Sequence, residues 1–389
     1  MRILIAAGIF PPDIGGPAIY AERLASHLAK TGHSLRVLCY SSGSNALQFP
    51  YPVIRVRRRS FKGITFFMYA VLLIRYAIRS DCIYAQGPVA GGLQALIVRY
   101  LLRKPYLVKI TGDYAWEQAA ARYGLTRDID SFQGGTTTGL PFRVQVMRFV
   151  QKKVARSASC CIVPSAYLQS MVIAWGVPKT RTAVIYNAAD ISEATFAAKQ
   201  RASGASDRLV LSVGRLVPWK GFATLIRLWP ALLSNQPDAH LVIAGSGPES
   251  EKLSALIQRM HLGNRVTLLG SVTQRELRAW YRKSYCFVLN SGYEGFSHAV
   301  LEAMAAGLPC SVSRVGGNPE LIRHDTNGLL FRYNSEKEIV ECLKKLLHNP
   351  TIADRLGKNA HETALQFTPE RMLSSTTRVL EAFRKKGAL

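Results

Sequence analysis

Residues 208–221 read Arg-Leu-Val-Leu-Ser-Val-Gly-Arg-Leu-Val-Pro-Trp-Lys-Gly, and the fold class follows from this stretch. Its first six residues are a short and mostly apolar run, which is typical of a strand buried in a parallel sheet. Glycine and proline then interrupt the run, and a helical pattern begins near Gly221. In open α/β sheets, ligands bind at such strand-to-helix turns. The stretch therefore predicts a doubly wound α/β domain with a binding loop at residues 214–221.

The same alternation of strand and helix extends in both directions along the 389-residue chain. It predicts two Rossmann-like parallel-sheet domains at residues 1–189 and 208–368, a linker at 190–207, and a C-terminal helix at 369–389. We expect that helix to return to the first domain. Residues 1–10 superficially resemble a signal peptide, but Pro11 and Pro12 stand where a small-residue cleavage site would be, so a buried first strand at 2–7 is favoured. The other predicted strands lie at 34–40, 82–84, 106–110, 159–163, 240–244, 266–269, 286–289 and 309–312.

Composition indicates a folded protein with an anionic partner. Apolar residues make up 48% of the chain and charged residues 19%, which argues against disorder. The net charge is +25, and residues 1–190 hold 24 basic and only 8 acidic side chains. Such a balance suits nucleic acid, an anionic membrane or a phosphorylated substrate. The seven cysteines form no C-x-x-C pair, which favours a reducing, cytoplasmic compartment.

Two sequence features predict chemistry in the second half. Arg215 and Lys220 follow one strand, where two cations can neutralise a leaving diphosphate. A solvated loop with two basic residues would have the same sequence pattern. Glu294 and Glu302 are separated by seven residues, the first in a glycine-rich loop and the second in the following helix. Such a loop can receive a phosphate, and the deeper carboxylate can bind a ribose diol. The alternative is a pair of exposed glutamates at a helix end.

Taken together, the motifs resemble the retaining glycosyltransferases of the two-Rossmann GT-B fold, specifically glycosyltransferase family 4, which builds bacterial surface polysaccharides and glycolipids. The resemblance covers nearly the whole chain. Besides the four charged residues it rests on the Gly15-Gly16 loop, Asn187 in Val-Ile-Tyr-Asn-Ala-Ala-Asp, Ala-Gly-Ser-Gly-Pro at 244–248 and Gly-Gly-Asn-Pro-Glu at 316–320. It implies two domains facing across a cleft, with the donor held by the second.

The resemblance also implies roles at the matching positions. Arg215 and Lys220 would bind the donor diphosphate in the loop that Gly214 begins, and Glu302 would bind the ribose. Glu294, with the backbone of Phe296 and Ser297, would lie beside the donor sugar and phosphates. Val272, at the end of 269–272, would border the base. Gly15 and Gly16 would let the backbone of the first domain approach the diphosphate.

The sequence departs from the family pattern at three places. Family members often carry a histidine after the fourth strand of the first domain; here the chain has Asp113, which could make hydrogen bonds there. The usual Asn-Gly is Asn187-Ala188, so glycine does not meet any demand for a positive φ. Ser297-His298 replaces the commoner Gly-Leu, and a histidine packed on the helix face is favoured over a catalytic one.

The family resemblance implies transfer with retention, no cofactor beyond the nucleotide-sugar co-substrate and no obligatory metal. The expected mechanism is front-face, with the departing phosphate oxygen taking the acceptor proton, and Asp113 or Glu294 as a covalent nucleophile has no support in the sequence. A sugar-nucleotide epimerase on the same fold is the alternative enzyme, and a basic nucleic-acid-binding protein is the alternative from another class. The latter would need a zinc spacing or a recognition helix that the sequence does not contain.

The acceptor is expected on the basic first domain. Residues 55–62, with five basic side chains, lead into an apolar run at 63–74 that is too short to span a bilayer. Basic residues beside such a run suit an interfacial anchor, although a helix buried against the sheet fits equally well. Residues 126–140 are expected to be a mobile acceptor loop or an ordinary surface insertion. The enzyme is therefore expected to be cytoplasmic, peripheral on the inner face of the cell membrane, and to use a glycan or polyprenyl-linked acceptor.

Overall fold

The structure is a computed structural model that describes residues 1–13, 15–41, 47–58, 62–125, 127–135, 139–189 and 208–386. The chain divides into two compact units. Unit 1 contains residues 1–119, 132–185 and 370–389, and unit 2 contains residues 120–131 and 186–369. The predicted linker at 190–207 lies outside the described residues.

Unit 1 is built on a parallel sheet of seven strands in the order β3-β2-β1-β4-β5-β6-β7. Because β1 pairs with both β2 and β4, the strand order reverses between β1 and β4. Residues 3–7 of β1 are buried, as the apolar start of the chain predicts. The strands are β1 (Arg2–Ala7), β2 (Ser34–Ser41), β3 (Val53–Arg57), β4 (Cys82–Gln86), β5 (Tyr106–Lys109), β6 (Cys160–Val163) and β7 (Thr182–Val184).

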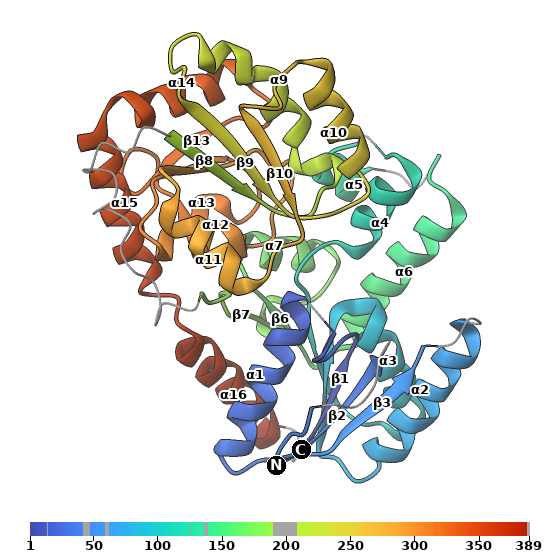
Figure 1. Ribbon diagram of the computed structural model, residues 1–389. Helices are drawn as coiled ribbons and strands as arrows, with labels where there is room; N and C mark the ends of the chain where they lie inside the picture. Colours follow the sequence, from blue (N-terminus) through green and yellow to red (C-terminus); the bar gives the residue numbers. More distant parts are fainter. Residues whose placement is uncertain are drawn as a thin grey trace. The chain divides into compact units, whose positions relative to one another are not determined.

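Helices cover both faces of this sheet (Figure 1). On one face α1 lies beside α16, where the Tyr20 hydroxyl is 3.4 Å from Thr376 Oγ1. On the other, α2 and α6 both pack against α3. The helices drawn with these strands are α1 (Gly16–Lys30), α2 (Lys62–Ala77), a π-helix (Gly87–Gly91), α3 (Gly92–Leu102), α4 (Tyr114–Tyr123), α5 (Ile129–Gly134), α6 (Phe142–Ser157), α7 (Ala166–Ala174) and α16 (Pro369–Lys386).

Unit 2 has a parallel sheet of six strands in the order β10-β9-β8-β11-β12-β13, so its strand order reverses between β8 and β11. Two apolar clusters pack around the sheet, one containing Trp229 and the other Phe287. The strands are β8 (Arg208–Val213), β9 (Ala239–Ala244), β10 (Val266–Gly270), β11 (Cys286–Leu289), β12 (Cys310–Ser313) and β13 (Leu329–Phe331). The helices are α9 (Phe222–Leu233), α10 (Ser250–Arg259), α11 (Gln274–Lys283), α12 (His298–Ala305), α13 (Asn318–Leu321), α14 (Glu336–His348) and α15 (Pro350–Ala364).

The two parallel-sheet units confirm the predicted fold class, and three strands were not foreseen. β7 and β13 have three residues each, too few for a pattern to emerge. β3 overlaps the basic stretch at 55–62 and was missed because Arg55 and Arg57 break its apolar pattern. The stretch 126–140 was expected to be a loop, but it contains α5, whose start is fixed by Asp128 accepting a 2.8 Å hydrogen bond from the Ser131 amide.

Candidate functional site

The reversal of strand order in unit 2 places the loops that follow β8 and β11 next to each other. Lys220 lies in the first loop and Glu294 in the second, and Lys220 Nζ is 2.5 Å from Glu294 Oε1. The side chain of Lys220 is 16% exposed to solvent and that of Glu294 is 9% exposed. The carboxyl edge at a strand reversal is the ligand position of open α/β sheets. A fixed cation and carboxylate therefore occupy the place where this fold binds ligands.

A second set of contacts fixes the shape of the β8 loop. Gly221 has φ of 60°, and a Cβ there would collide with the backbone oxygen and side chain of Asn290. Asn290 Nδ2 donates to the Gly221 carbonyl at 3.2 Å and to Asn334 Oδ1 at 2.8 Å. Asn290 and Asn334 were not predicted as functional. The signal in the sequence was the asparagine at the first position after an apolar strand.

Arg215 is the exposed cation of the same loop. Its guanidinium carbon lies 5.5 Å from the centre of the Trp219 ring, a cation–π contact that holds it over the loop. Gly214 begins the turn, and a Cβ there would touch Lys220 Cδ at 3.5 Å. One loop thus carries a partly buried cation and an exposed one, and the exposed guanidinium remains accessible to an anion.

The Gly-Gly-Asn-Pro-Glu element at 316–320 contacts the backbone of the loop that contains Glu294. The Gly317 amide donates to the Glu294 carbonyl at 2.9 Å. Gly316 has φ of 54°, and a Cβ there would collide with that same carbonyl. This motif, named above only as part of the family resemblance, therefore positions the backbone of Glu294.

Phe296 and Ser297 lead from this loop into α12. The Phe296 carbonyl accepts a 3.2 Å hydrogen bond from Asn187 Nδ2, and its ring packs on Tyr186 and Phe367. Ser297 caps the helix by accepting from the Val300 amide at 3.4 Å, and no acidic residue lies in the first turn. The first turn therefore leaves the positive end of the helix dipole without an acidic side chain of its own, which favours an anion there. Ala188 has no positive φ, so alanine fits that position.

Glu302 lies one turn deeper in α12 and is half-buried. It accepts hydrogen bonds from the Tyr281 hydroxyl at 3.1 Å and from Gln274 Nε2 at 3.3 Å. Burial, and then the Glu302 carboxylate, raise the pKa of Tyr281 well above its ordinary range. Both partners come from α11, which Val272 precedes; Val272 packs against the core of unit 2. His298 is exposed on the first turn of α12.

In unit 1, Gly15 and Gly16 stand at the N-terminus of α1. Gly15 occupies the N-cap position, so no side chain caps the helix, and the first turn contains no acidic residue. A Cβ added to Gly16 would meet no atom within 4 Å. The helix start is therefore open to a ligand on the side of Gly16.

Asp113 is fully buried inside unit 1. Its Oδ1 accepts from the Trp116 amide at 2.9 Å and from Gln151 Nε2 at 2.8 Å, while Oδ2 accepts from Gln133 Nε2. Burial raises the pKa of Asp113, and these hydrogen bonds and the nearby Arg148 act in the opposite direction. With both oxygens engaged, the carboxylate organises α4, α5 and α6, and a direct contact with sugar remains only a prediction.

Known proteins match the chain along nearly its full length. Residues 14–193 match the model of Glycosyltransferase Family 4, and residues 194–363 match that of Glycosyl transferases group 1. The chain belongs to the glycosyltransferases of this family 4, GT-B type. An uncharacterized glycosyltransferase of Methanocaldococcus jannaschii is 27% identical over 92% of both chains. N-acetyl-alpha-D-glucosaminyl L-malate synthase of Bacillus anthracis is 23% identical over 93% of both.

Solved glycosyltransferases share the fold. Sucrose-phosphate synthase from Thermosynechococcus elongatus superimposes with a TM-score of 0.79 and 22% identity, covering 98% of each chain. Anabaena HepE, solved with UDP and glucose, has a TM-score of 0.77 and 22% identity, covering 98% of this chain and all of its own. At this level of identity the likeness establishes the fold.

The basic stretch at 55–62 of the glycosyltransferase, which was expected beside a membrane anchor, makes contacts within unit 1. Arg55, within β3, donates to the Pro11 carbonyl at 2.6 Å, and Arg58 donates to the Gly8 carbonyl at 3.4 Å. These side chains therefore bind the loop after β1, while residues 59–61 lie outside the described part. The apolar run at 63–74 lies in α2, with Tyr69 and Leu73 buried and Phe67 67% exposed. One face of α2 is thus buried, as a helix packed against the sheet would be, and the other exposes apolar side chains, as an interfacial anchor would.

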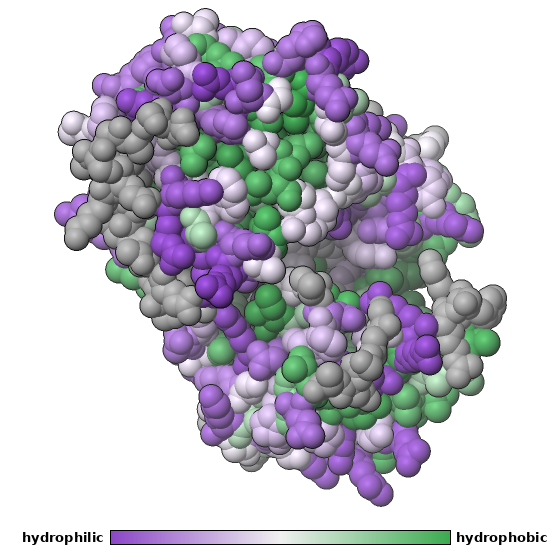
Figure 2. All heavy atoms as spheres, viewed as in Figure 1, coloured by the Kyte–Doolittle hydropathy of each residue, from purple (hydrophilic) through white to green (hydrophobic). Residues whose placement is uncertain are grey.

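Exposed apolar side chains gather on α2, α3 and α6, and we call these helices the α2–α3–α6 surface. Nine of the fifteen large apolar side chains exposed in the described chain lie on them. The three helices carry no acidic residue, and Arg75, Arg143 and Lys153 are exposed beside the apolar ones. Part of this surface is visible at the right-hand edge of Figure 2. The exposed apolar members are Ile64, Phe67, Met68, Val71, Tyr100, Leu101, Phe142, Val146 and Phe149.

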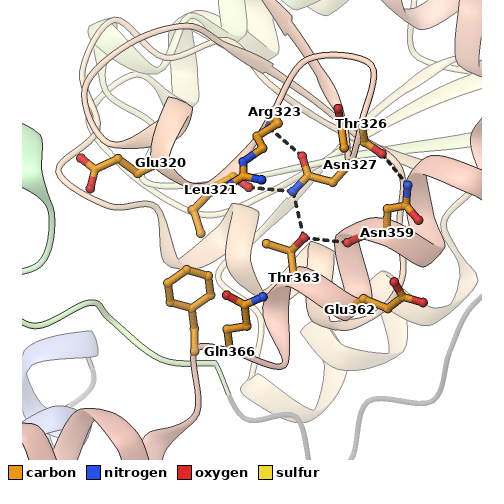
Figure 3. Close-up of a pocket in the computed structure, with 10 residues that line it drawn as sticks. Glu320, Leu321, Arg323, Thr326, Asn327, Asn359, Glu362, Thr363 and Gln366 are labelled. Carbon is orange, nitrogen blue, oxygen red and sulfur yellow. Dashed lines mark hydrogen bonds between the residues drawn. The ribbon is translucent and has the colours of Figure 1, made fainter.

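Figure 3 shows a hollow in unit 2, of about 320 Å³, between α15 and the turn that follows α13. Asn359 and Thr326 tie its walls together with a 2.7 Å hydrogen bond. None of the predicted site residues lines it.

Among the described residues no three side chains of His, Cys, Asp or Glu lie together as metal ligands would. No helix in the described part of the chain has the length and apolarity to cross a bilayer.

Proposed function

We propose that the glycosyltransferase moves a hexosyl-type sugar from a UDP- or GDP-sugar to a glycan or lipid-linked acceptor, with retention, in the synthesis of a cell-surface polysaccharide or glycolipid. The observation that carries this proposal is the Lys220–Glu294 pair at the strand reversal of unit 2. Anabaena HepE has been solved with UDP-glucose, and a TarM variant of S. aureus with UDP and alpha-GlcNAc-glycerol. These complexes support a nucleotide-sugar donor and a glycan acceptor.

In the proposed reaction the bond between the anomeric carbon and the donor phosphate breaks. The acceptor oxygen forms the new bond on the same face, and its proton passes to the departing phosphate oxygen. Arg215 and Lys220 stabilise the charge that grows on the diphosphate, and fixed cations of this kind act most strongly where water is excluded. Glu294 holds Lys220 in place, and Glu302 accepts hydrogen bonds from the ribose. The amides at the start of α12 receive a phosphate oxygen.

The reaction requires no obligatory metal in this proposal, because Arg215 and Lys220 supply positive charge in one loop. The epimerase alternative would use the same donor loops without an acceptor. The basic surface that suggested nucleic acid is better matched to anionic lipid, because exposed apolar side chains accompany its cations on the α2–α3–α6 surface.

We infer further that the enzyme is peripheral at the cytoplasmic leaflet. An interfacial helix buries apolar side chains among lipid head groups, while its basic side chains attract anionic lipid. The α2–α3–α6 surface offers both properties over three neighbouring helices. A polyprenyl-linked acceptor would be presented at this interface.

A screen of UDP-, GDP- and ADP-sugars for thermal stabilisation tests the donor. A ligand at 100 times its Kd adds about 2.7 kcal/mol to the free energy of unfolding. We expect one nucleotide class to raise the melting temperature, and the same class to be consumed when acceptor is present. If none of them stabilises the protein, the proposed function is wrong.

A further inference from the structure

Among the residues that the structure describes, one buried lysine of unit 1 has neither a hydrogen-bond partner nor an anionic partner for its ammonium. Lys109 is the last residue of β5 and is only 4% exposed, and its Nζ makes no hydrogen bond. The ammonium lies 3.4 Å from the centre of the Tyr20 ring, in the second turn of α1. Buried charges are normally paired, because removing an ion from water is costly. An unpaired buried lysine therefore marks a position where function outweighs stability.

The side chains of Gln86, Tyr20 and Tyr84, which lie around Lys109 in the described structure, are uncharged at neutral pH. On the neighbouring strand Gln86 is in register with Lys109, so both side chains lie on the α1 face of the sheet. Gln86 Nε2 donates to the Pro17 carbonyl at 3.3 Å, and its Oε1 is buried without a partner. The Tyr20 hydroxyl is 2.7 Å from that of Tyr84 on β4. Burial alone lowers the pKa of Lys109 to about 7.

This cluster lies directly beneath the start of α1. Gln86 reaches the first turn through Pro17, and Lys109 reaches the second through Tyr20. The 15-residue helix has no side-chain cap and no acid in its first turn. A helix start of this kind carries about half a positive charge and binds anions. An anion placed there would bring a negative charge close to Lys109.

We propose that an anionic phosphate group bound at the N-terminus of α1 draws a proton onto Lys109, so that ligand binding to unit 1 is coupled to proton uptake. Before binding, Lys109 exchanges its proton with solvent near neutral pH. A nearby negative charge favours the protonated form, and weak screening in the protein interior lets the effect act beyond hydrogen-bond distance. The proton comes from solvent, and Lys109 acts as a positioning residue that strengthens the anion site. The identity of the anion as a nucleoside diphosphate rests on the proposed function.

Calorimetry of UDP binding at about pH 8, in buffers of different ionisation enthalpy, tests the coupling, because there a lysine with a pKa of about 7 is mostly neutral. Wild-type protein should take up close to one proton per UDP. Lys109→Met should bind UDP about tenfold more weakly, and its binding should cause no proton uptake at this site. Lys109→Arg, which stays charged, should bind without uptake. Lys30→Met, in the last turn of α1, is the matched control and should behave as wild type.

Inorganic pyrophosphate separates this inference from the proposed function. If pyrophosphate causes uptake that depends on Lys109 while UDP gives no response, the inference stands and the nucleotide donor is wrong. If Lys109→Met takes up as many protons as wild type with either ligand, or if neither ligand binds wild-type protein, the inference is overturned.

Discussion

Lys220 Nζ and Glu294 Oε1 lie 2.5 Å apart, although 74 residues separate them in the chain. The pair joins the loop after β8 to the loop after β11, at the point where the strand order of unit 2 reverses. Both side chains are largely buried. The carboxylate fixes the direction of the ammonium before any ligand arrives, so the cation needs little reorganisation when charge develops nearby.

Breaking the pair should cost both activity and stability. Lys220→Ala should lower transfer by about 3–4 kcal/mol of transition-state stabilisation. It leaves Glu294 buried without its counter-ion, so the free energy of unfolding should fall by about 3–5 kcal/mol. The double variant Lys220→Met, Glu294→Gln, which removes both charges, should be nearly as stable as wild type and as inactive as Lys220→Ala. Urea unfolding and steady-state kinetics measure the two effects. Wild-type turnover by folded Lys220→Ala would contradict the assignment.

Glu302→Ala should weaken binding of the free nucleoside diphosphate as well as that of the sugar nucleotide. Losing hydrogen bonds from a ribose to a charged acceptor costs about 1.5–3 kcal/mol. Tyr281→Phe, which removes only the hydroxyl that donates to Glu302 at 3.1 Å, is the matched variant and should have a smaller effect. Calorimetry with the diphosphate gives both affinities. Unchanged affinity in Glu302→Ala would remove this residue from the site.

Lys109→Met should stabilise the protein in a pH-dependent way. The pKa of Lys109 is lowered to about 7 in the folded protein from 10.5. The unfavourable charge is therefore fully present below pH 7 and fades as pH rises toward 10.5. We expect the variant to gain about 3–5 kcal/mol in unfolding free energy at pH 7 and to gain progressively less at higher pH. Urea unfolding at pH 7 and pH 9.5 measures this. A gain that grows with pH would contradict the assignment of an unpaired buried ammonium.

Binding to vesicles of phosphatidylglycerol should have a salt-sensitive and a salt-resistant part. Screening acts over about 8–10 Å at physiological salt, so the contribution of the basic side chains should fall as salt rises. Burial of hydrocarbon does not depend on counter-ions. Phe67→Ser with Phe149→Ser should therefore remove the salt-resistant part, and Arg75→Ser with Lys153→Ser the salt-sensitive part. Exposed Leu365, in unit 2, offers the control variant Leu365→Ser. If wild-type protein stays in the supernatant at low salt, the membrane proposal fails.

The sequence predicted most of the sheet because buried parallel strands appear as continuous apolar runs. Strands β1, β8 and β11 begin and end at the predicted residues. Strand β3 was missed because Arg55 and Arg57 interrupt its pattern at the edge of the sheet.

The sequence predicted which residues form the candidate site, but it did not predict how they contact one another. Arg215, Lys220, Glu294 and Glu302 stand in recognisable motifs, but a contact between residues 74 positions apart depends on the order of the strands. Lys109 was read as part of an apolar strand. A single lysine at the end of such a run was the available signal, and only the burial of its surroundings shows that the charge is unpaired.

Calorimetric titration with UDP and GDP, comparing wild-type protein with the double variant Arg215→Ala, Lys220→Met, tests the central claim most directly. The account predicts that wild-type protein binds one of the two nucleotides. The double variant should lose at least a hundredfold in affinity, because each charged contact to the diphosphate contributes about 1.5–3 kcal/mol. The exposed Arg259→Ala, at the end of α10, should bind as wild type does. Equal affinity in wild type and the double variant would contradict the claim that the loop after β8 holds the donor.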